Sequence, residues 1–552
     1  MKRLVMLCSI LCLGFFILLT GCTDTNNLPA IEGTMSTVIY KTAISVNTSF
    51  TDTNEHDLYH DMVKVFVSLS STGDEAKEIS RKDVIIVKPT VGEDGSISKE
   101  MSGQKLEFSN LTADTKYVLK LVITASGSQK TLNTREVTTI NNGESEDDPI
   151  LIDSLDLLLG MNKDKKAYYK LTADIDCGGT LSSIFNSSSY FSGKLDGDGH
   201  KIYNMTFDSN NYTGLFGYMQ GATVKNLVIE DATYNASRSE TYLGALAGYA
   251  KNCTIQNVTV NRVDFSHSGQ STRNSYLGGL VGKAEDSTIE NCVVNDLSLK
   301  IIRGQLRIYV GGFIGINENT KITNCHVNGT MDTTIVYTNP SSSEENNGGC
   351  FYLGGFCGVN DSNLGIHSSY SKVNITVKED SVNNSGTKKH KTYVGGFAGG
   401  NIHDGSKFID CAAIGEINVK AENMYTFYFG GFAGYTDDQN ISRFENCIYV
   451  PTGTGVTIDL MPKKEEKEST GDSTDKEEDK EEDKGIAQTA YVSLAIGRIG
   501  EKSRQTIINV IVYRDVITIN NEHEKTNKTL YTVSTDISLF SQAIQTVIRD
   551  AA

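Results

Sequence analysis

One short segment recurs seven times in this chain, and its recurrence limits the folds that the chain can adopt. In its fullest form it reads Tyr-x-Gly-Gly-Phe/Leu-x-Gly, as in residues 276–282. The copies follow one another at intervals of 31 to 43 residues. Their last glycines are Gly217, Gly248, Gly282, Gly315, Gly358, Gly399 and Gly434. Self-similarity at such a period is typical of a solenoid, in which each repeat packs only against its neighbours.

A second element follows the copies, and the order of its apolar residues predicts a bend. It reads Ile-Gln-Asn-Val-Thr-Val at residues 255–260, with large apolar residues at its first, fourth and sixth positions. In a straight strand the first position faces away from the other two, so all three face inward only if the chain bends. The Asn at the third position tolerates the left-handed backbone that a sharp bend requires. We therefore expect a column of corner residues, hydrogen-bonded from coil to coil and interrupted by Ser368. Its members are Asn226, Asn257, Asn291, Asn324, Asp410 and Asn446.

A strand that bends once in every repeat favours a parallel β-helix, because each coil then buries its inner face against neighbouring coils. The expected fold class is all-β, with an N-terminal β-sandwich followed by a right-handed parallel β-helix. Within the Tyr-x-Gly-Gly-Phe-x-Gly strand we expect the Phe or Leu to face the core. The glycines are expected to allow tight bending and close approach of the backbone.

The copies resemble the GLUG motif, which is named for its Gly-Leu-any-Gly core. Residues 279–282 and 214–217 fit that core, and later copies carry Phe in place of Leu, whereas Ala245 departs from it. The resemblance covers about 300 residues of the chain. It implies a bacterial surface protein, since the motif occurs in large adhesins and in some immunoglobulin A peptidases. No catalytic residue belongs to the motif itself.

The N-terminus has the pattern of an export signal. Lys2 and Arg3 precede an apolar run that ends in Leu-Thr-Gly-Cys at residues 19–22. This ending resembles the bacterial lipobox, which implies cleavage before Cys22 and acylation of its thiol with palmitate-like chains. We expect a lipid-anchored, exported protein of the bacterial cell envelope, at the cell surface. A transmembrane anchor with a chance cysteine is the alternative.

Residues 34–140 alternate apolar and polar side chains over short stretches, which predicts a small β domain. Tyr117 follows a turn and opens an alternating strand. It resembles the tyrosine corner of fibronectin type III-like sandwiches, where the hydroxyl is tied to an upstream backbone group. A generic β-sandwich is the alternative.

The chain is expected to divide at composition changes. Residues 463–484 hold 11 acidic and 6 basic side chains and no aromatic one, which favours a disordered loop inside a last, degenerate repeat. A linker to a separate C-terminal piece is the alternative. A short helix at 153–159, capped by Asp153 and ended by Gly160, is assigned to an N-terminal cap. The expected segments are 1–21 signal peptide, 22–33 tether, 34–140 sandwich, 141–150 linker, 151–210 cap and entry coils, 211–450 seven repeats, 451–486 acidic loop, and 487–552 final repeat with a C-terminal cap.

Eight cysteines remain after Cys22, and none lies in a Cys-x-x-Cys pair, so a zinc or redox site is not expected. Four of them share one position of the second element, which Leu227 and Val258 hold in other copies. We therefore expect buried thiols in an apolar pocket. They are Cys292, Cys325, Cys411 and Cys447.

The remaining chemistry-bearing residues favour no catalytic site, no metal and no cofactor. The formal charge of -17 excludes a typical nucleic-acid binder. His523-Glu524 lacks the second His of a zinc protease. Residues 196–199, Asp-Gly-Asp-Gly, favour a tight turn over a calcium loop. The scattered acids share no position with a Lys or Arg partner, and three histidines are interpreted as surface residues or as residues with satisfied hydrogen bonds. These residues are Asp231, Asp264, Asp296, Asp332, His326, His367 and His403.

Two functions of different class follow. The first is a non-catalytic, membrane-anchored surface protein that presents a β-helical binding or adhesion face to an extracellular glycan or host protein. The second is a polysaccharide lyase or hydrolase on a parallel β-helix, which would need convergent carboxylates on one outer face.

Overall fold

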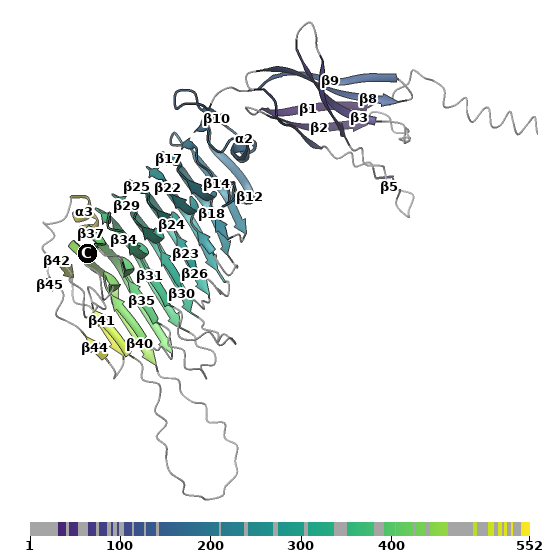
Figure 1. The fold of residues 1–552 in the computed structure, drawn as a ribbon. Coiled ribbons are helices and arrows are strands. Elements are labelled where there is room, and N and C mark those ends of the chain that lie inside the picture. The colour runs from purple at the N-terminus through teal and green to yellow at the C-terminus, as the bar shows by residue number, and fades with distance from the viewer. Residues whose placement is uncertain are drawn as a thin grey trace, which may run out of the picture. The chain divides into compact units, whose positions relative to one another are not determined.

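The computed structural model contains two compact units, Met1–Ile150 and Leu151–Ala552 (Figure 1). It describes residues 31–551 apart from gaps at 40–42, 53–63, 73–76, 85–89, 92–96, 99–103, 113–114, 126–127, 140–142, 209–210, 237–240, 269–273, 303–306, 336–349, 380–390, 403–404, 423–425, 437–441, 462–488, 494–505, 513–516, 521–523, 527–531 and 534–541. The signal segment, Cys22, His403, His523 and the acidic run of 463–484 therefore lie outside the described residues.

The first unit is a β-sandwich. One antiparallel sheet has the order β1 (Ile31–Ile39), β2 (Ile44–Asp52), β7 (Lys105–Phe108). The facing sheet has the order β4 (Glu78–Val84), β3 (Lys64–Ser71), β8 (Lys116–Ala125), β9 (Ser128–Thr138), and β5 (Thr90–Val91) pairs with β6 (Ile97–Ser98). Alternating apolar residues of both sheets, such as Val46 and Leu119, form one core. The hydroxyl of Tyr117 accepts a hydrogen bond from the backbone N–H of Thr112 at 3.0 Å, as a tyrosine corner requires.

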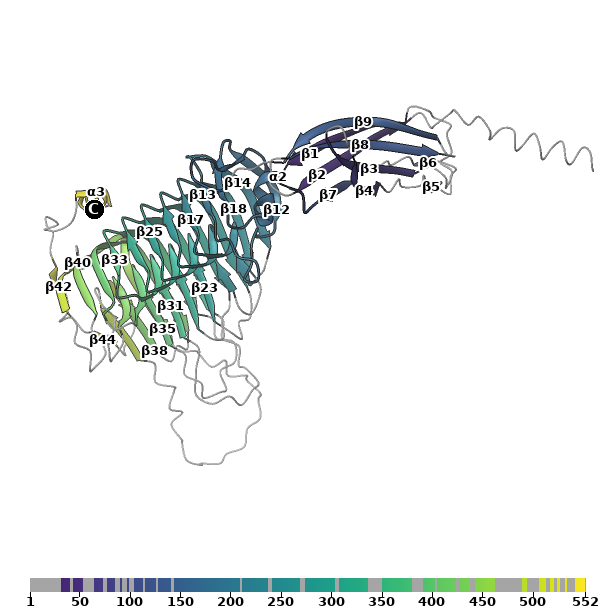
Figure 2. The same cartoon turned by 45° about the horizontal axis from the view of Figure 1, so that its top comes forward.

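The second unit is a parallel β-helix, and successive coils stack their strands side by side (Figures 1 and 2). Within the described residues its strands form three sheets. The 20-stranded sheet contains β10 (Ile150–Ile152), β11 (Tyr168–Leu171), β12 (Ile175–Leu181), β13 (Lys194–Asp196), β14 (Lys201–Asp208), β17 (Thr223–Lys225), β18 (Val228–Ala236), β21 (Thr254–Gln256), β22 (Thr259–His267), β25 (Thr288–Glu290), β26 (Val293–Ile302), β29 (Lys321–Thr323), β30 (His326–Ile335), β33 (Ile366–His367), β34 (Tyr370–Glu379), β37 (Lys407–Glu422), β40 (Arg443–Met461), β42 (Thr506–Val512), β43 (Ile517–Asn520) and β45 (Thr532–Val533).

Most strands of the other two sheets come from the Tyr-x-Gly-Gly-Phe-x-Gly segments, each of which is split by its central bend. The nine-stranded sheet contains β15 (Tyr212–Thr213), β19 (Thr241–Leu243), β23 (Ser275–Gly278), β27 (Ile308–Gly311), β31 (Cys350–Gly354), β35 (Lys391–Gly395), β38 (Thr426–Gly430), β41 (Thr489–Ser493) and β44 (Glu524–Thr526). The seven-stranded sheet contains β16 (Phe216–Gln220), β20 (Ala247–Lys251), β24 (Val281–Glu285), β28 (Ile314–Glu318), β32 (Cys357–Asp361), β36 (Ala398–Asn401) and β39 (Ala433–Thr436).

The expected corner column has the left-handed backbone that a sharp bend needs. Its φ values lie between 51° and 54° at Asn226, Asn257, Asn291, Asn324, Asp410 and Asn446. The amide of Asn257 donates to the side-chain oxygen of Asn226 at 2.9 Å, and Asn324 donates to Asn291 at 2.7 Å. Ser368 keeps the same conformation, with φ 48°, although it has no amide to extend the ladder.

Two further corner columns were not expected from the sequence. One contains Asn252, Asp286 and Asn319, with φ between 44° and 52°. The other contains Asn204, Asp231, Arg262 and Asp296, with φ between 50° and 61°. The prediction that Asp231 and Asp296 share no position with a basic partner is therefore wrong. They occupy one corner in different coils, and Arg262 of the same corner pairs with Asp231.

The core confirms the inward positions that the repeat predicts. Ile255, Val258 and Val260 have no exposed surface, so the bend turns all three inward. The Phe or Leu of the glycine segment is also fully buried, and its rings stack from coil to coil at 4.7 to 4.9 Å between centroids. The stacked residues are Phe313, Phe356, Phe397 and Phe432.

The repeated glycines lie where neighbouring backbones leave no room for a side chain. A Cβ on Gly279 would lie 2.1 Å from the carbonyl oxygen of Gly312 in the next coil. A Cβ on Gly282 would lie 2.6 Å from the backbone nitrogen of Leu243 and 2.8 Å from the oxygen of Tyr276. Gly282 and its six equivalents thus let the strand after the bend lie against the strand before it.

The cysteine column consists of free, buried thiols. The Sγ of Cys292 lies 3.2 Å from the carbonyl oxygen of Glu290, and Cys411 makes the same contact with Ile409 at 3.4 Å. Ser369, at the equivalent position, donates to the oxygen of His367 at 2.7 Å. The position is therefore not purely apolar, because it also accepts a short side chain that donates to the carbonyl of the corner.

Helices cover the coils at two places. α2 (Leu155–Gly160) continues into a 3-10 turn, Met161–Lys163, so Gly160 does not end the helical stretch. Ser154 rather than Asp153 is the N-cap, and it makes no side-chain cap hydrogen bond.

The strand β40 continues to Met461, so residues 451–461, which the sequence pattern assigns to the acidic loop, belong to the β-helix instead. In the part of the chain that is described, no helix is long and apolar enough to cross a membrane.

The C-terminal helix α3 (Gln542–Ala551) rests on the outer face of β37 and β40. Its Ile544 and Ile548 are buried against Ala412, Ile414, Ile448 and Val450. Earlier coils carry polar side chains at the position of Ile414 and Val450, namely Glu230, Asn261, Asn295, Asn328 and Lys372. The outer face thus becomes apolar where the helix covers it.

Candidate functional site

A column of tyrosines lies on the outer face of the nine-stranded sheet. Each repeat begins with a Tyr, and parallel pairing sets these residues in register. Consecutive rings stack with centroids 4.7 to 5.3 Å apart and interplanar angles of 4° to 19°. This spacing is that of neighbouring strands. The column is Tyr212, Tyr242, Tyr276, Tyr309, Tyr352, Tyr393 and Tyr428.

A second column on the seven-stranded sheet packs against the first. Its members in register are Tyr218, Tyr249, Lys283, Ile316, Val359, Gly400 and Tyr435. At its ends, aromatic rings of the two columns meet, with 5.4 Å between Tyr212 and Tyr218 and 4.8 Å between Tyr393 and Tyr435. In the middle, Ile316 and Val359 form an apolar cluster with Tyr309. We call these two columns together the aromatic seam.

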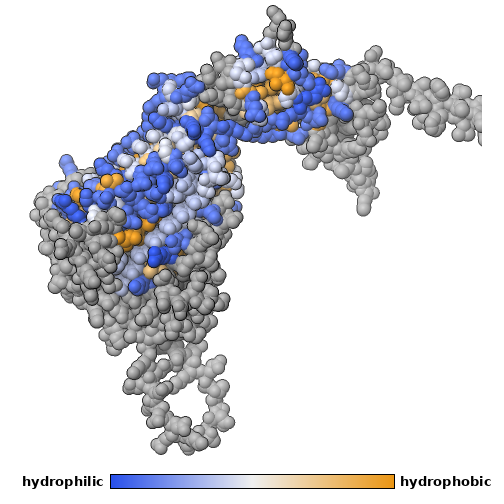
Figure 3. Space-filling model, viewed as in Figure 1, coloured by the Kyte–Doolittle hydropathy of each residue, from blue (hydrophilic) through white to orange (hydrophobic). Residues whose placement is uncertain are grey.

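The seam offers ring edges and neutral phenols to a ligand. Tyr212, Tyr242, Tyr276 and Tyr352 are half-buried, whereas Tyr309, Tyr393 and Tyr428 are only 3–5% exposed. Burial raises the pKa of Tyr309, and it raises that of Tyr352 well above the ordinary range. The hydroxyls of Tyr309 and Tyr352 therefore stay protonated at neutral pH. The coloured face of the second unit in Figure 3 is largely hydrophilic, and the exposed large hydrophobic residues among those described are Ile79, Leu151 and Leu364.

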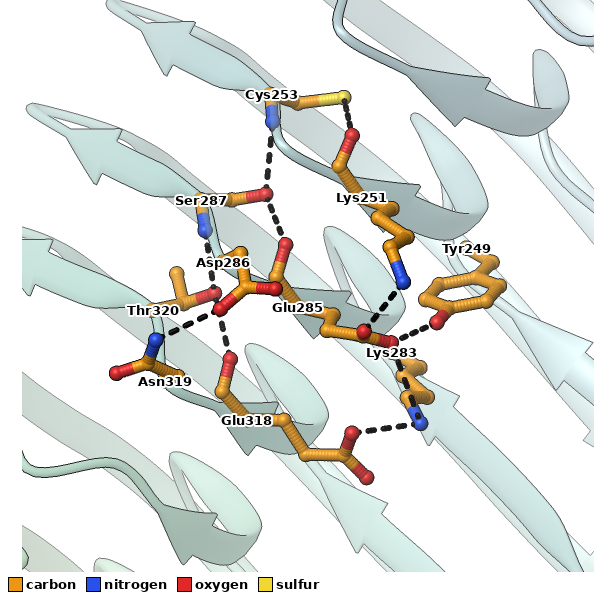
Figure 4. A network of polar contacts seen from close by, with 10 residues as sticks. All are labelled: Tyr249, Lys251, Cys253, Lys283, Glu285, Asp286, Ser287, Glu318, Asn319 and Thr320. Atoms are coloured by element: carbon orange, nitrogen blue, oxygen red, sulfur yellow. Dashed lines mark hydrogen bonds and ion pairs between the residues drawn. The ribbon is translucent and has the colours of Figure 1, made fainter.

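Charged side chains from β20, β24 and β28 border the first coils of the seam (Figure 4). Lys251 pairs with Glu285 at 2.6 Å, and the hydroxyl of Tyr249 donates to the same carboxylate. Lys283 pairs with Glu318 at 2.8 Å and lies 3.8 Å from Glu285. The Lys283 ammonium also lies 5.2 Å from the ring centroid of Tyr249, so it joins the carboxylates to the aromatic column.

Glu285 is held ionised. Its partial burial alone would raise the pKa of its carboxyl, but the hydrogen bonds from Lys251 and Tyr249 outweigh burial and lower that pKa below its ordinary value. A general acid at neutral pH needs the opposite shift. The arrangement suits hydrogen bonding to a ligand's hydroxyl groups better than proton transfer.

The other candidates from the sequence lie in structural positions. The Asp196 carboxylate accepts the N–H of Asp198 at 2.9 Å and the amide of Asn226 at 3.0 Å, which forms the expected tight turn. His326 stacks on Tyr370 with centroids 4.6 Å apart, and His367 contacts the carbonyl of Leu364. Across the described ranges, no group of three or more His, Cys, Asp or Glu side chains is placed to hold a metal.

The seam is the feature that sequence reasoning missed. The first column was visible as the Tyr that opens each copy, yet it served only to mark the repeat. The second column changes from Tyr249 to Lys283 to Ile316 between coils, so it has no common residue that a repeat search could find. It emerges only from the strand register.

A family model described as the GLUG motif matches residues 273–299 and 307–332. The chain contains GLUG motifs. Halomucin of Haloquadratum walsbyi is 29% identical over 214 residues, which is 34% of this chain and 2% of that protein's length.

Solved structures similar to the chain include an IgA1 protease (TM-score 0.40, 14% identity, 88% of this chain and 31% of that chain). They also include the catalytic domain of a GH87 alpha-1,3-glucanase with tetrasaccharides (TM-score 0.21, 11% identity, 92% and 96%). The chain thus spans a small part of halomucin and about a third of the IgA1 protease.

Proposed function

We propose that this protein is a non-catalytic, lipid-anchored bacterial surface protein whose β-helix binds a glycan along the aromatic seam. The observation that carries the proposal is the in-register column of tyrosines, stacked at 4.7 to 5.3 Å over seven coils. A rigid solenoid holds such a column straight, so a linear ligand that lies along it meets a half-buried Tyr ring in each of the first three coils and again at Tyr352.

The chemistry of the seam favours a neutral glycan over a protein. Aromatic side chains with a polar tip pack on apolar faces of a ligand while the tip hydrogen-bonds. Beside them, the Glu285 and Glu318 carboxylates accept hydrogen bonds from hydroxyl groups. These acids and the net charge of -17 repel an anionic polymer.

Surface exposure and anchoring are supported by different parts of the chain. The GLUG motifs and the halomucin match favour a surface-associated protein. The lipobox-like ending at Cys22 supports a lipid anchor. The N-terminal sandwich, with its Tyr117 corner, resembles fibronectin type III-like domains and would serve as a spacer between membrane and β-helix.

An array of immobilised glycans and host proteins, probed with residues 22–552, tests this function. We expect neutral, linear glycans to retain the protein and Tyr276→Ala to weaken that retention. Retention by proteins alone, or an unchanged pattern for the Tyr276→Ala variant, would contradict a glycan-binding seam.

An enzyme on the same seam is the second candidate, because Glu285 and Glu318 lie on adjacent coils and share Lys283. Most glycoside hydrolases use a pair of carboxylates, one as the general acid and the other as the nucleophile or base. The lowered pKa of Glu285 would suit the nucleophile or base of such a pair and disfavours Glu285 as its general acid. Release of soluble sugars from the retained glycan, lost in a Glu285→Gln variant, would establish the enzyme and overturn the non-catalytic proposal.

A further inference from the structure

A second candidate site lies on the outer face of the 20-stranded sheet, away from the strands that form the seam. It is a pocket of about 500 Å³. Side chains from β30, β34, β37 and β40 line it, including the apolar Ile414 of β37, and the strands β30 and β37 contribute glycines. The residues that matter are Asn328, Lys372, Asn374, Thr452, Gly329 and Gly415. Pockets of this size accommodate small organic ligands, since such sites commonly measure about 300–1,000 Å³.

Two glycines make the hollow. Gly329 and Gly415 have φ of 145° and 151°. The pairing register shifts beside each of them, between Val294 and Leu297 and between Gly415 and Ile417. A Cβ on either glycine would lie 2.2 Å from a carbonyl oxygen of the preceding coil. Neither position has room for a side chain, so the outer face of the sheet is left uncovered there.

The pocket presents an unneutralised cation. Lys372 is exposed, and among the described residues it has neither an ion pair nor a hydrogen bond. Lys201 and Lys283 on the outer surface are neutralised instead, since Lys201 pairs with Glu230 at 2.9 Å and Lys283 pairs with Glu318 at 2.8 Å. Lys378 of the same strand as Lys372 has no ion pair within the described ranges either, so the pocket around Lys372 is what distinguishes it. A cation that lines a pocket without a counter-ion is a site for an anionic group.

Neutral donors accompany the cation. The side-chain oxygen of Asn374 accepts the N–H of Glu416 at 3.0 Å, which fixes the amide and leaves its NH₂ group available. The Asn328 side chain is held in place at the edge of the pocket, because it accepts the N–H of Asp296 at 3.0 Å and donates to Asn295 at 2.7 Å. The neighbouring carboxylate, Glu416, is engaged by the backbone N–H of Thr454 at 3.2 Å rather than by Lys372.

We propose that this pocket binds a sugar acid, a pyranose-sized molecule whose carboxylate pairs with Lys372 and whose hydroxyls meet Asn374 and Thr452. The volume is too large for a bare ion, and the polar lining favours hydroxyl groups over an apolar body. The ligand differs from that of the seam because the charges differ, with a free ammonium here and paired carboxylates there.

Calorimetric titration of glucuronate into residues 22–552 tests the inference, with glucose and acetate as probes of the sugar and the carboxylate alone. We expect glucuronate to bind at least about tenfold more tightly than either probe. Lys372→Gln should weaken glucuronate binding by about tenfold, since a hydrogen bond to a charged group has about that effect. Lys378→Gln is the matched control, because Lys378 is also exposed on β34 and lies on the same face.

Equal binding of glucose and glucuronate, no heat of binding with millimolar glucuronate, or unchanged affinity in Lys372→Gln would each overturn the inference. Equal loss in Lys372→Gln and Lys378→Gln would show a general charge effect and would also overturn it. An unchanged melting temperature of both variants shows that the fold is intact. Failure here leaves the seam untouched, because Tyr276→Ala tests a different sheet.

Discussion

The side-chain amide of Asn257 donates a hydrogen bond of 2.9 Å to the side-chain oxygen of Asn226 in the preceding coil, and both residues have φ of 53°. One residue type thus performs two tasks at the corner. It tolerates the left-handed backbone, and it ties neighbouring coils together.

Replacing Asn257 should separate these two tasks. Asn257→Ala loses the amide and places an ordinary side chain in the left-handed region, so we expect a cost of about 2 kcal/mol. Asn257→Gly loses the amide but accepts the backbone, and should cost about half as much. Urea unfolding followed by circular dichroism measures both. A larger loss for Gly than for Ala would contradict the role of backbone conformation.

The cysteine column should tolerate small side chains and reject charge. Cys292→Val should cost less than about 1.5 kcal/mol, because the change in volume is small. Cys292→Ser should also fold, since Ser369 already donates to the corner carbonyl at the equivalent position. Cys292→Asp should prevent folding of the coil, because it buries an unpaired charge.

The same thiols should react slowly in the native protein. Burial leaves Cys292 with no exposed surface and raises the pKa of the Cys411 thiol to about 12. A bulky thiol reagent should therefore label the four cysteines of the column only after unfolding in urea. Rapid labelling of the native protein at these positions would show that the column assignment is wrong.

His267 should make the β-helix sensitive to acid. Its ring is buried, and among the described residues neither ring nitrogen has a hydrogen-bond partner; this burial lowers its pKa to about 4. The unfolded chain binds the proton more tightly, with a pKa of about 6.5, so stability is complete above that pH. It should fall as the pH drops from about 6.5 toward about 4, by roughly 3 kcal/mol in total.

A His267→Leu variant removes the titrating group and is accommodated by a core position that Ala236 and Ile301 hold in neighbouring coils. Its midpoint of unfolding should change less between pH 7 and pH 4.5 than that of the natural protein. Identical pH profiles of the two proteins would exclude His267 as a source of the acid sensitivity.

The C-terminal helix should stabilise the coils it covers. Ile548 is fully buried against the apolar patch of β37 and β40, so Ile548→Ala should cost about 2–4 kcal/mol. Thr546→Ala on the exposed side of α3 is the control and should change stability by less than about 0.5 kcal/mol. Equal melting temperatures of the two variants would show that the helix does not contribute.

Cys22 should direct the protein to a membrane. In cell fractionation, we expect the natural protein in the membrane fraction and Cys22→Ser as unprocessed or mislocalised precursor. Normal processing of Cys22→Ser together with equal membrane recovery would exclude a lipid anchor at this residue.

The repeat alone was sufficient to predict the β-helix and one of its corners, because Asn257 and its equivalents recur at one offset beside positions that are apolar in most copies. The other corners escaped detection, since Asn252, Asp286 and Asn319 differ in type and precede residues as different as Cys253 and Thr320. The backbone requirement is the same there, but several residue types meet it.

Long-range packing accounts for the remaining differences. Nothing near Ile548 in the sequence indicates that it packs on Ile414, which lies more than a hundred residues earlier. The pocket beside Lys372 likewise depends on two bulges in different coils, at Gly329 and Gly415. Such features follow from strand register, which a single repeat unit does not define.

The affinity of a seam variant for the retained glycan tests the central claim most directly. Tyr276→Ala removes a half-buried ring from the seam, whereas Tyr203→Ala removes a half-buried ring from β14 on the outer face of the 20-stranded sheet. By calorimetric titration with an oligosaccharide of that glycan, we predict about tenfold weaker binding for Tyr276→Ala, as is typical of an aromatic contact residue, and unchanged binding for Tyr203→Ala. Unchanged binding of Tyr276→Ala, or an equal loss in both variants, would contradict the claim that the seam holds the ligand.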